Sequence, residues 1–197
     1  MLPALKQEIT RRRLLWISPF ALAGLVAFLF RRGDRSAATV AANDNTEPVT
    51  IVQFNDAGAK LDRTSVKKVV HSGSEWRKLL SSEQFYVTRQ QGTDMAFSGT
   101  YYQLHDPGIF RCVCCATALF SSDTKFDSGT GWPSFWAPIA DENVNQRSDR
   151  SLLMERVEVQ CKRCDAHLGH VFDDGPPPTD LRYCINESAL RFIPHKS

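Results

Sequence analysis

Six cysteines are the residues of this sequence whose types and spacing most directly suggest chemistry. Cys112 and Cys115 form one Cys-x-x-Cys pair, Cys161 and Cys164 form a second, and 45 residues separate the two pairs. A two-residue loop lets both thiolates of a pair point at one ion, and four thiolates complete the tetrahedral shell of a structural zinc ion. The duplicated pair therefore predicts a zinc site with these four cysteines as its ligands.

Other interpretations of these cysteines stay open. The pairs could form two disulfides, as happens in oxidising compartments, or one pair could be redox-active. His167 and His170 follow the second pair closely and could serve as ligands instead. We favour four thiolates, because they already close the shell and leave the histidines free for another task.

Cys184 has no Cys-x-x-Cys partner and lies in a segment of alternating character. If residues 181–186 form a strand, their apolar side chains share the face toward the core. The opposite face then carries Arg182, Cys184 and Asn186. A neighbouring guanidinium favours the thiolate, which is the nucleophilic form of cysteine. The alternation alone is equally consistent with Cys184 as a small buried hydrophobe.

Two further groups of side chains could bind or transform a ligand. His167 and His170 offer an acid–base pair, although histidines often only satisfy hydrogen bonds in a core. Between residues 127 and 136, glycines allow a tight backbone path and place Trp132 on a loop. The Trp132 ring could then face a ligand, or it could pack in the core with neighbouring aromatic residues.

The elements that must position these residues are short. Ser72 and Ser81 each begin a capping box, which predicts two short helices between residues 74 and 87. Beyond them, turn residues come often and apolar runs stay short, which favours strands. Residues 153–160 alternate in polarity, and residues 190–193 are typical of a last strand. We therefore expect one compact antiparallel β domain that follows a helical preface.

Composition and charge narrow the class of protein. Hydrophobic residues make up 42% and charged residues 23% of the 197 residues, which excludes a wholly disordered or fibrous chain. Residues 1–35 carry seven Lys or Arg side chains and two acidic ones, a net charge of +5, although the whole chain is only +2. The remainder is therefore acidic overall and offers no footprint for nucleic acid.

The basic N-terminus resembles an export signal. Residues 10–15, TRRRLL, are similar to a twin-arginine motif, and the uncharged run that follows is at the lower edge of what spans a bilayer. Small residues further on would suit cleavage, whereas Arg31 and Arg32 would suit a retained anchor. We assign residues 1–35 to a signal or membrane anchor, 36–71 to a linker and 72–197 to the folded domain, and we expect a periplasmic protein.

Several motifs together resemble one family, the methionine-R-sulfoxide reductases (methionine sulfoxide reductase B). They are KFDSGTGWPSF at residues 125–135, CKRCDAHLGHVF at 161–172 and RYCIN at 182–186. The similarity extends over about residues 74–194. The resemblance implies a mainly β fold of two antiparallel β-sheets, short N-terminal helices and one structural zinc ion per chain, away from the chemistry.

The resemblance also implies an activity, the reduction of the R epimer of methionine sulfoxide, mainly within proteins. Cys184 matches the nucleophile, whose thiolate attacks the sulfoxide sulfur and becomes a sulfenic acid. The other matched positions are His167, His170 and Asn186 as catalytic residues, and Trp132, Phe172, Asp174 and Arg182 as substrate-binding residues. The paired histidines would protonate the departing oxygen, and the Trp132 ring would pack against the methyl group of the substrate.

One position departs from the family pattern. Many members carry a resolving cysteine where this chain has Thr130, which cannot form a disulfide. Cys114 has no assigned role, but it lies inside the predicted zinc knuckle and is a poor resolver. We therefore expect an external thiol or a thioredoxin-like partner to reduce the Cys184 sulfenic acid directly, and a monomeric enzyme.

Two other classes of protein stay open. An inactive, zinc-stabilised binding module would share the scaffold, but it has no need of Cys184, both histidines and Trp132. A thiol–disulfide oxidoreductase would use Cys161 and Cys164, and it requires that this pair hold no metal.

Overall fold

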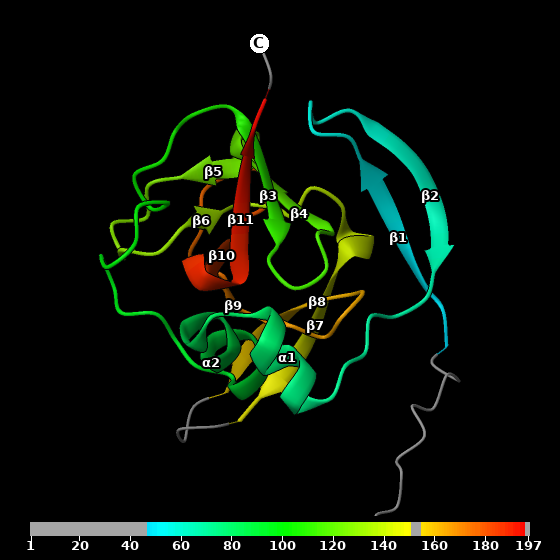
Figure 1. The fold of residues 1–197 in the computed structure, drawn as a ribbon. Helices are drawn as coiled ribbons and strands as arrows, with labels where there is room; N and C mark the ends of the chain where they lie inside the picture. The colour runs from blue at the N-terminus through cyan, green and yellow to red at the C-terminus, as the bar shows by residue number, and fades with distance from the viewer. Residues whose placement is uncertain (1–46, 151–154, 196–197) are drawn as a thin grey trace, which may run out of the picture. The chain divides into compact units, whose positions relative to one another are not determined.

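The structure is a computed structural model that describes residues 47–150 and 155–195. Two strands come first, β1 (Val49–Phe54) and β2 (Lys60–Val66), and two helices follow, α1 (Gly73–Leu79) and α2 (Ser82–Gln90) (Figure 1). The later strands are β3 (Gly108–Cys112), β4 (Ala118–Ser121), β5 (Lys125–Phe126), β6 (Ser134–Phe135), β7 (Val144–Asp149), β8 (Arg156–Cys161), β9 (His167–Phe172), β10 (Arg182–Ile185) and β11 (Leu190–Pro194). Short 3₁₀ helices occupy Ser122–Thr124, Asp141–Asn143 and Glu187–Ala189.

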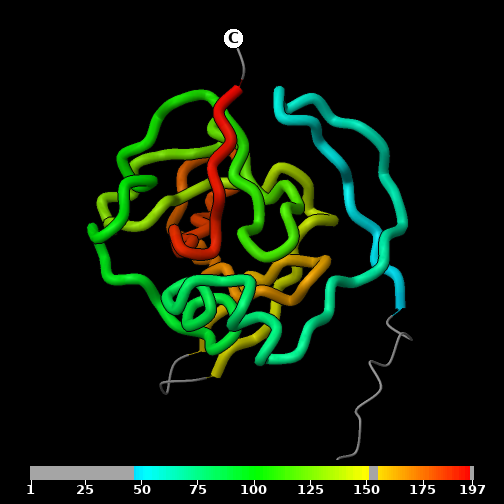
Figure 2. Tube along the Cα trace, in the orientation of Figure 1, coloured from blue at the N-terminus to red at the C-terminus, as the bar shows by residue number. Residues whose placement is uncertain are grey.

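Within residues 47–150 and 155–195, the strands form three antiparallel sheets. One has six strands in the order β5-β6-β10-β9-β8-β7, one has three in the order β11-β3-β4, and β1 pairs with β2. Figure 2 shows the last strand beside residues 108–112, in agreement with the pairing of Phe192 with Phe110. The expected mainly β fold with two antiparallel sheets and short N-terminal helices is confirmed, and the β1–β2 hairpin adds a third sheet.

Aromatic side chains fill the core between the two larger sheets. Phe110 from β3 and Phe120 from β4 both contact Phe135 from β6, with ring centroids 5.0 and 4.5 Å apart. All three side chains are fully buried. Tyr183 of β10 joins them, with its ring 5.8 Å from that of Phe120. Because side chains alternate along a strand, this packing turns the neighbouring Cys184 away from the core.

Both predicted helices are confirmed, with the caps that the sequence indicates. Ser72 and Ser81 are the N-caps, and each side chain accepts a hydrogen bond from the backbone N–H three residues on. The side chains of Glu75 and Gln84 in turn accept hydrogen bonds from the backbone N–H groups of Ser72 and Ser81, which completes both capping boxes. Trp76 and Phe85 bury the inner faces of the two helices.

The β1–β2 hairpin corrects the assignment of residues 36–71 to a linker, because residues 49–66 of that range form strands. Asn143, which is fully buried, accepts the Val52 N–H at 2.8 Å and donates to the Val52 carbonyl at 2.9 Å. It also donates to the Ala118 carbonyl at 2.7 Å. The hairpin is thus anchored by a residue 91 positions further on, which local composition does not reveal.

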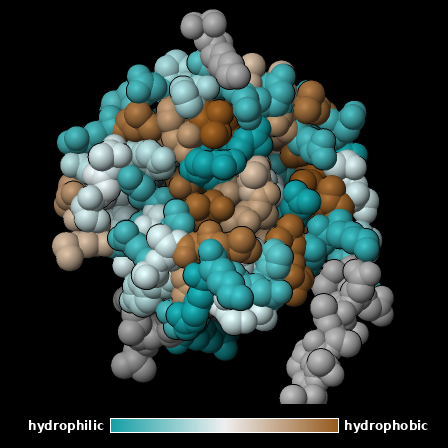
Figure 3. Space-filling model, viewed as in Figure 1, coloured by the Kyte–Doolittle hydropathy of each residue, from teal (hydrophilic) through white to brown (hydrophobic). Residues whose placement is uncertain are grey.

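The predicted signal or anchor, residues 1–35, lies outside the described residues. Among the helices of the described ranges, none has the length and apolar character needed to cross a bilayer. On the face shown in Figure 3, apolar side chains are interspersed with hydrophilic ones.

Candidate active site and metal centre

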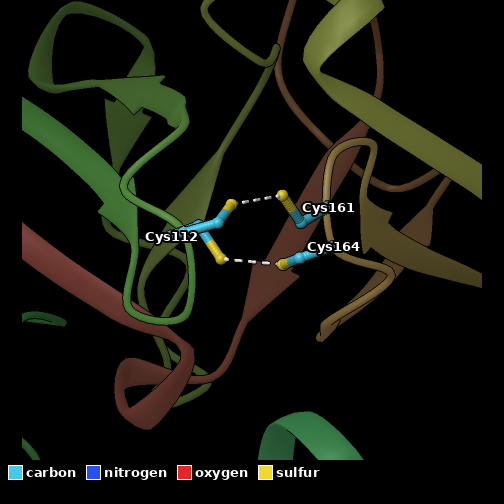
Figure 4. A group of neighbouring side chains, drawn as sticks. Cys112, Cys161 and Cys164 are labelled. Atoms are coloured by element: carbon cyan, nitrogen blue, oxygen red, sulfur yellow. Dashed lines mark hydrogen bonds between the residues drawn. The ribbon is translucent and has the colours of Figure 1, made fainter. Parts of the chain in front are cut away.

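The four cysteines of the two pairs meet in one cluster. Their sulfur atoms all lie within 4.8 Å of one another. Cys112 Sγ is 3.7 Å from Cys164 Sγ, and Cys115 Sγ is 3.5 Å from Cys161 Sγ. Figure 4 shows Cys112 on one side and Cys161 and Cys164 on the other, with their sulfur atoms turned toward one another.

These distances suit a metal ion better than disulfides. Four sulfurs at about 2.3 Å from one zinc ion lie roughly 3.8 Å apart, whereas a disulfide needs about 2.05 Å. All six cysteines are free thiols. The cluster joins the β3–β4 turn to the β8–β9 turn, and therefore one sheet to the other. We conclude that the four cysteines form a structural metal site.

A cation accompanies the thiolate cluster. The Arg89 guanidinium donates to the Cys164 carbonyl at 2.8 Å and to Cys164 Sγ at 3.4 Å. It also packs 4.2 Å above the Trp76 ring. Four thiolates around a divalent ion keep a net negative charge, which this guanidinium offsets. Helix α2 is thereby tied to the second Cys-x-x-Cys turn.

The Cys184 side chain lines a separate small cavity of about 140 Å³. Its neighbours in β10, Tyr183 and Ile185, are buried in the core, so Cys184 projects from the opposite face, as the alternation predicts. The residues that line the cavity are Thr93, Trp132, Arg156, His170, Phe172, Cys184 and Asn186. The structure thus gathers five of the predicted site residues around one pocket.

Burial raises the pKa of the Cys184 thiol above its ordinary value. The positive charge of Arg182 and a hydrogen bond from the Thr130 side chain both lower this pKa, but they do not outweigh burial. Arg182 therefore acts in the direction that the sequence suggests, yet Cys184 is a protonated thiol at neutral pH when the cavity is empty.

An irregularity in β9 explains how His167 and His170 come together. Side chains three residues apart on a regular strand point to opposite faces. Here the pairing with β8 shifts between Val159 and Gln160, so an extra residue is inserted in β9. Gly169 sits at this bulge, where a Cβ would collide with the Cys184 carbonyl. The two histidine rings are consequently 5.4 Å apart.

The two histidines have different surroundings. His170 lines the cavity, and its Nε2 lies 2.8 Å from Asp149 Oδ2. Burial lowers the pKa of His170, so its ring is neutral at pH 7. His167 does not line the Cys184 cavity. It is buried, and its Nδ1 lies 2.7 Å from Glu158 Oε1.

Trp132 and Asn186 are fixed by the same residue, Asp94. The Trp132 indole Nε1 donates to the Asp94 carbonyl at 3.0 Å, and the Asp94 N–H donates to Asn186 Oδ1 at 2.9 Å. The Asn186 amide also donates to the Leu168 carbonyl at 3.0 Å. These bonds hold the Trp132 loop against β9 and β10 and keep the indole at the cavity.

The remaining predicted residues stand at the edge of the site. Arg182 donates to both carboxylate oxygens of Asp174, at 2.8 and 2.9 Å, and its guanidinium lies 4.5 Å from the Phe172 ring. Phe172 lines the cavity, whereas Asp174 and Arg182 do not. The ion pair therefore supports the outer side of the Phe172 ring.

Four residues of this region were missed by the sequence analysis. Arg156 and Glu158 lie on the polar face of the alternating strand β8, and this alternation was the sequence pattern that could have pointed to them. Thr93 and Asp149 follow no motif. Asp149 accepts from Arg156 Nη2 at 2.8 Å as well as pairing with His170.

Together these features define a mainly β protein with two separate cysteine sites. One is a structural metal site of four cysteines, and the other is a small cavity lined by a single cysteine. Residues 80–194 match the family model described as the SelR domain, and the chain belongs to this family. It is 54% identical over 125 residues to the "Peptide methionine sulfoxide reductase MsrB" of Hahella chejuensis, a match that covers 64% of this chain and 90% of the relative. Identity is 55% over 126 residues with the protein of that name from Herminiimonas arsenicoxydans and 56% over 122 residues with that from Pseudomonas aeruginosa, covering 64% and 62% of this chain and 92% of each relative.

Proposed function

We propose that this chain reduces the R epimer of methionine sulfoxide in proteins back to methionine, with Cys184 as the nucleophile. The observation that carries this function is the single thiol at a cavity bounded by Trp132, Phe172 and His170, in a chain of the SelR family. Aromatic rings suit the methyl end of the substrate side chain, and a histidine suits its oxygen.

The reaction balances with the groups of the site. Cys184 Sγ attacks the sulfoxide sulfur, the sulfur–oxygen bond of the substrate breaks, and the oxygen ends on Cys184 as a sulfenic acid. Methionine sulfoxide gains two electrons and Cys184 loses two. Because burial keeps the Cys184 thiol protonated, the proton that the departing oxygen needs is already present in the cavity.

His170 is the residue best placed to move that proton. It lines the same cavity as Cys184, and Asp149 holds its ring. His167 packs against it and is oriented by Glu158. We assign His170 to proton transfer at the sulfoxide oxygen, and His167 to positioning the His170 ring.

The sulfenic acid must then be reduced from outside. One thiol forms a mixed disulfide with Cys184 and releases water, and a second thiol frees Cys184 as the external pair becomes a disulfide. Thr130 occupies the position at which the resemblance places a resolving cysteine. A thioredoxin-like protein or a small thiol is the reductant that this arrangement requires, and we propose that the enzyme acts as a monomer.

We propose zinc as the ion of the four-cysteine site, one per chain. Four thiolates from two Cys-x-x-Cys turns are a donor set that zinc favours, and the spacing of the sulfurs matches it. When bound there, the ion supplies folding energy. It has no part in the steps at Cys184.

We further propose that residues 1–35 direct export to the periplasm, where they are either cleaved or kept as a membrane anchor. The proposal is supported by the TRRRLL motif and the uncharged run after it. A fusion of residues 1–50 to a periplasm-dependent reporter tests it. We expect export that is lost when Arg11 and Arg12 are both replaced by Lys, and export that is unaffected by this change would contradict a twin-arginine route.

The activity is tested with the purified full chain, dithiothreitol and the separated R and S epimers of N-acetyl-methionine sulfoxide. We expect consumption of the R epimer only, and its loss in Cys184→Ser, which should melt like the parent. Consumption of neither epimer by folded, metal-loaded protein would instead support a binding module that has lost activity.

A further inference from the structure

Two large apolar side chains are exposed in the segment that follows Thr93, a residue that lines the Cys184 cavity. Met95 is 79% exposed and Phe97 is 58% exposed. Met95 follows directly on Asp94, which binds both Trp132 and Asn186, and Phe97 lies two residues further along. Large apolar side chains left in solvent close to a functional site are candidates for contacts with its ligand.

The backbone holds Phe97 in this position against its conformational preference. Its φ is +62°, the left-handed region that bulky residues rarely adopt. The Phe97 N–H donates to the Gly131 carbonyl at 3.0 Å, next to Trp132. The Met95 carbonyl accepts from Ser98 N–H and Oγ–H, at 3.2 and 2.7 Å. Unfavourable conformations that are held in place in this way concentrate at functional sites.

The size of the cavity limits what it can enclose. At about 140 Å³ it is smaller than the roughly 300–1,000 Å³ of sites that enclose a whole ligand. It therefore admits one side chain, and the residues on either side of a methionine sulfoxide must lie on the surface around its mouth. Methionine is common in protein cores, so the segments that carry its sulfoxide are rich in apolar residues.

We propose that Met95 and Phe97 form a docking rim that binds apolar side chains flanking the methionine sulfoxide in an unfolded polypeptide. The inference rests on the proposed function and specifies its substrate. The unbranched Met95 side chain adapts to neighbours of different shape, which suits an enzyme that meets many sequences. The Phe97 ring adds a flat apolar surface beside the Trp132 loop.

The test compares two five-residue peptides that carry methionine-R-sulfoxide at the centre, one flanked by leucines and one by serines. For the parent we expect a kcat/KM about tenfold higher with the leucine peptide, since one partly buried apolar side chain accounts for such a factor. In Met95→Ser and in Phe97→Asn this ratio should fall at least about threefold. Asparagine tolerates positive φ, so the second change removes the ring and keeps the loop.

Three controls make the result specific. Met95→Leu, which keeps an apolar side chain where Met95→Ser removes it, should retain the preference for the leucine peptide. Leu79→Ser alters a side chain of 62% exposure on α1 and should leave the preference unchanged. Turnover of N-acetyl-methionine-R-sulfoxide reports on the proposed function itself. If that turnover is absent, binding of the same peptides to Cys184→Ser, followed by fluorescence anisotropy, still tests the rim. A parent with no preference for leucine, or variants that keep it, would overturn the inference.

Discussion

The Thr130 side chain hydrogen-bonds the thiol of Cys184 and lowers its pKa, although burial still prevails. Thr130 is held in turn by Ser128, whose Oγ lies 2.8 Å from Thr130 Oγ1. The position that resembles the family's resolving cysteine thus lies near enough to the nucleophile to influence its pKa, and we expect its side chain to bear on how the sulfenic acid is removed.

Replacing Thr130 by cysteine should convert the enzyme to internal resolution. In Thr130→Cys we expect a disulfide between the introduced thiol and Cys184 after one turnover, because the side chain at position 130 is near enough to Cys184 to lower the pKa of its thiol. Mass spectrometry of substrate-treated protein without reductant measures it. Thr130→Ser, the matched control, and the parent should instead yield a sulfenic acid that dimedone traps. A Cys114–Cys184 disulfide formed by the parent at the rate of turnover would contradict external reduction.

Loss of one thiolate from the four-cysteine cluster should unfold the domain. The binding free energy of a structural zinc ion, about 10–16 kcal/mol, is comparable to or larger than the stability of a typical domain. Cys161→Ser should therefore lose bound metal and its cooperative melting transition, as followed by elemental analysis and calorimetry. Cys114→Ser, adjacent in sequence to the ligands but outside the cluster, should keep both. An unchanged melting temperature in Cys161→Ser would refute the structural role of the metal.

The reactivity of Cys184 should depend on pH in a specific way. Burial disfavours the anion, so the raised pKa of Cys184 keeps the thiolate scarce until the pH is well above neutral. Its rate of alkylation by iodoacetamide, measured on the Cys184 peptide, should rise about tenfold per pH unit from about 7 to 9 without levelling off. Arg182→Met should slow alkylation at pH 8, since the guanidinium lowers the pKa. An alkylation rate that levels off below pH 8 would contradict the conclusion that burial outweighs the guanidinium in setting the pKa of Cys184.

Replacing each histidine in turn should distinguish their roles, because one change should lower activity and the other should lower stability. His170→Gln should lower kcat by about 10²-fold and leave stability near that of the parent, because His170 lines the cavity. His167→Gln should cost about 1–3 kcal/mol of unfolding free energy, measured with urea, because Glu158 loses its buried partner. If instead His167→Gln removes as much activity at full stability, the assignment of the proton to His170 is wrong.

The placement of Cys184 could be predicted from the sequence because it depends on local alternation. Tyr183 and Ile185 face the core in a regular strand, and Cys184 must face away. The four metal-binding cysteines were predictable for a similar reason, since each pair closes its own short turn.

What the sequence did not reveal depends on long-range contacts. His167 and His170 were expected as a pair, but the period of a regular strand puts them on opposite faces. Their proximity depends on the bulge at Gly169, which arises from pairing with β8 and the approach of β10. The β1–β2 hairpin depends on Asn143, a single polar residue far along the chain. Asp149 enters the site only because β7 lies beside β8. None of these contacts leaves a local pattern.

The metal-binding turn and the histidine strand are nearly continuous. Only two residues lie between Cys164 and His167, and Arg89 bonds to Cys164 on the same side of the domain. Metal-depleted protein is therefore unsuitable as a blank for cysteine chemistry, because its histidines would have moved as well. Conversely, the imidazole resonances of His167, behind the Cys184 cavity, and of His170, which lines it, offer a spectroscopic readout of metal occupancy.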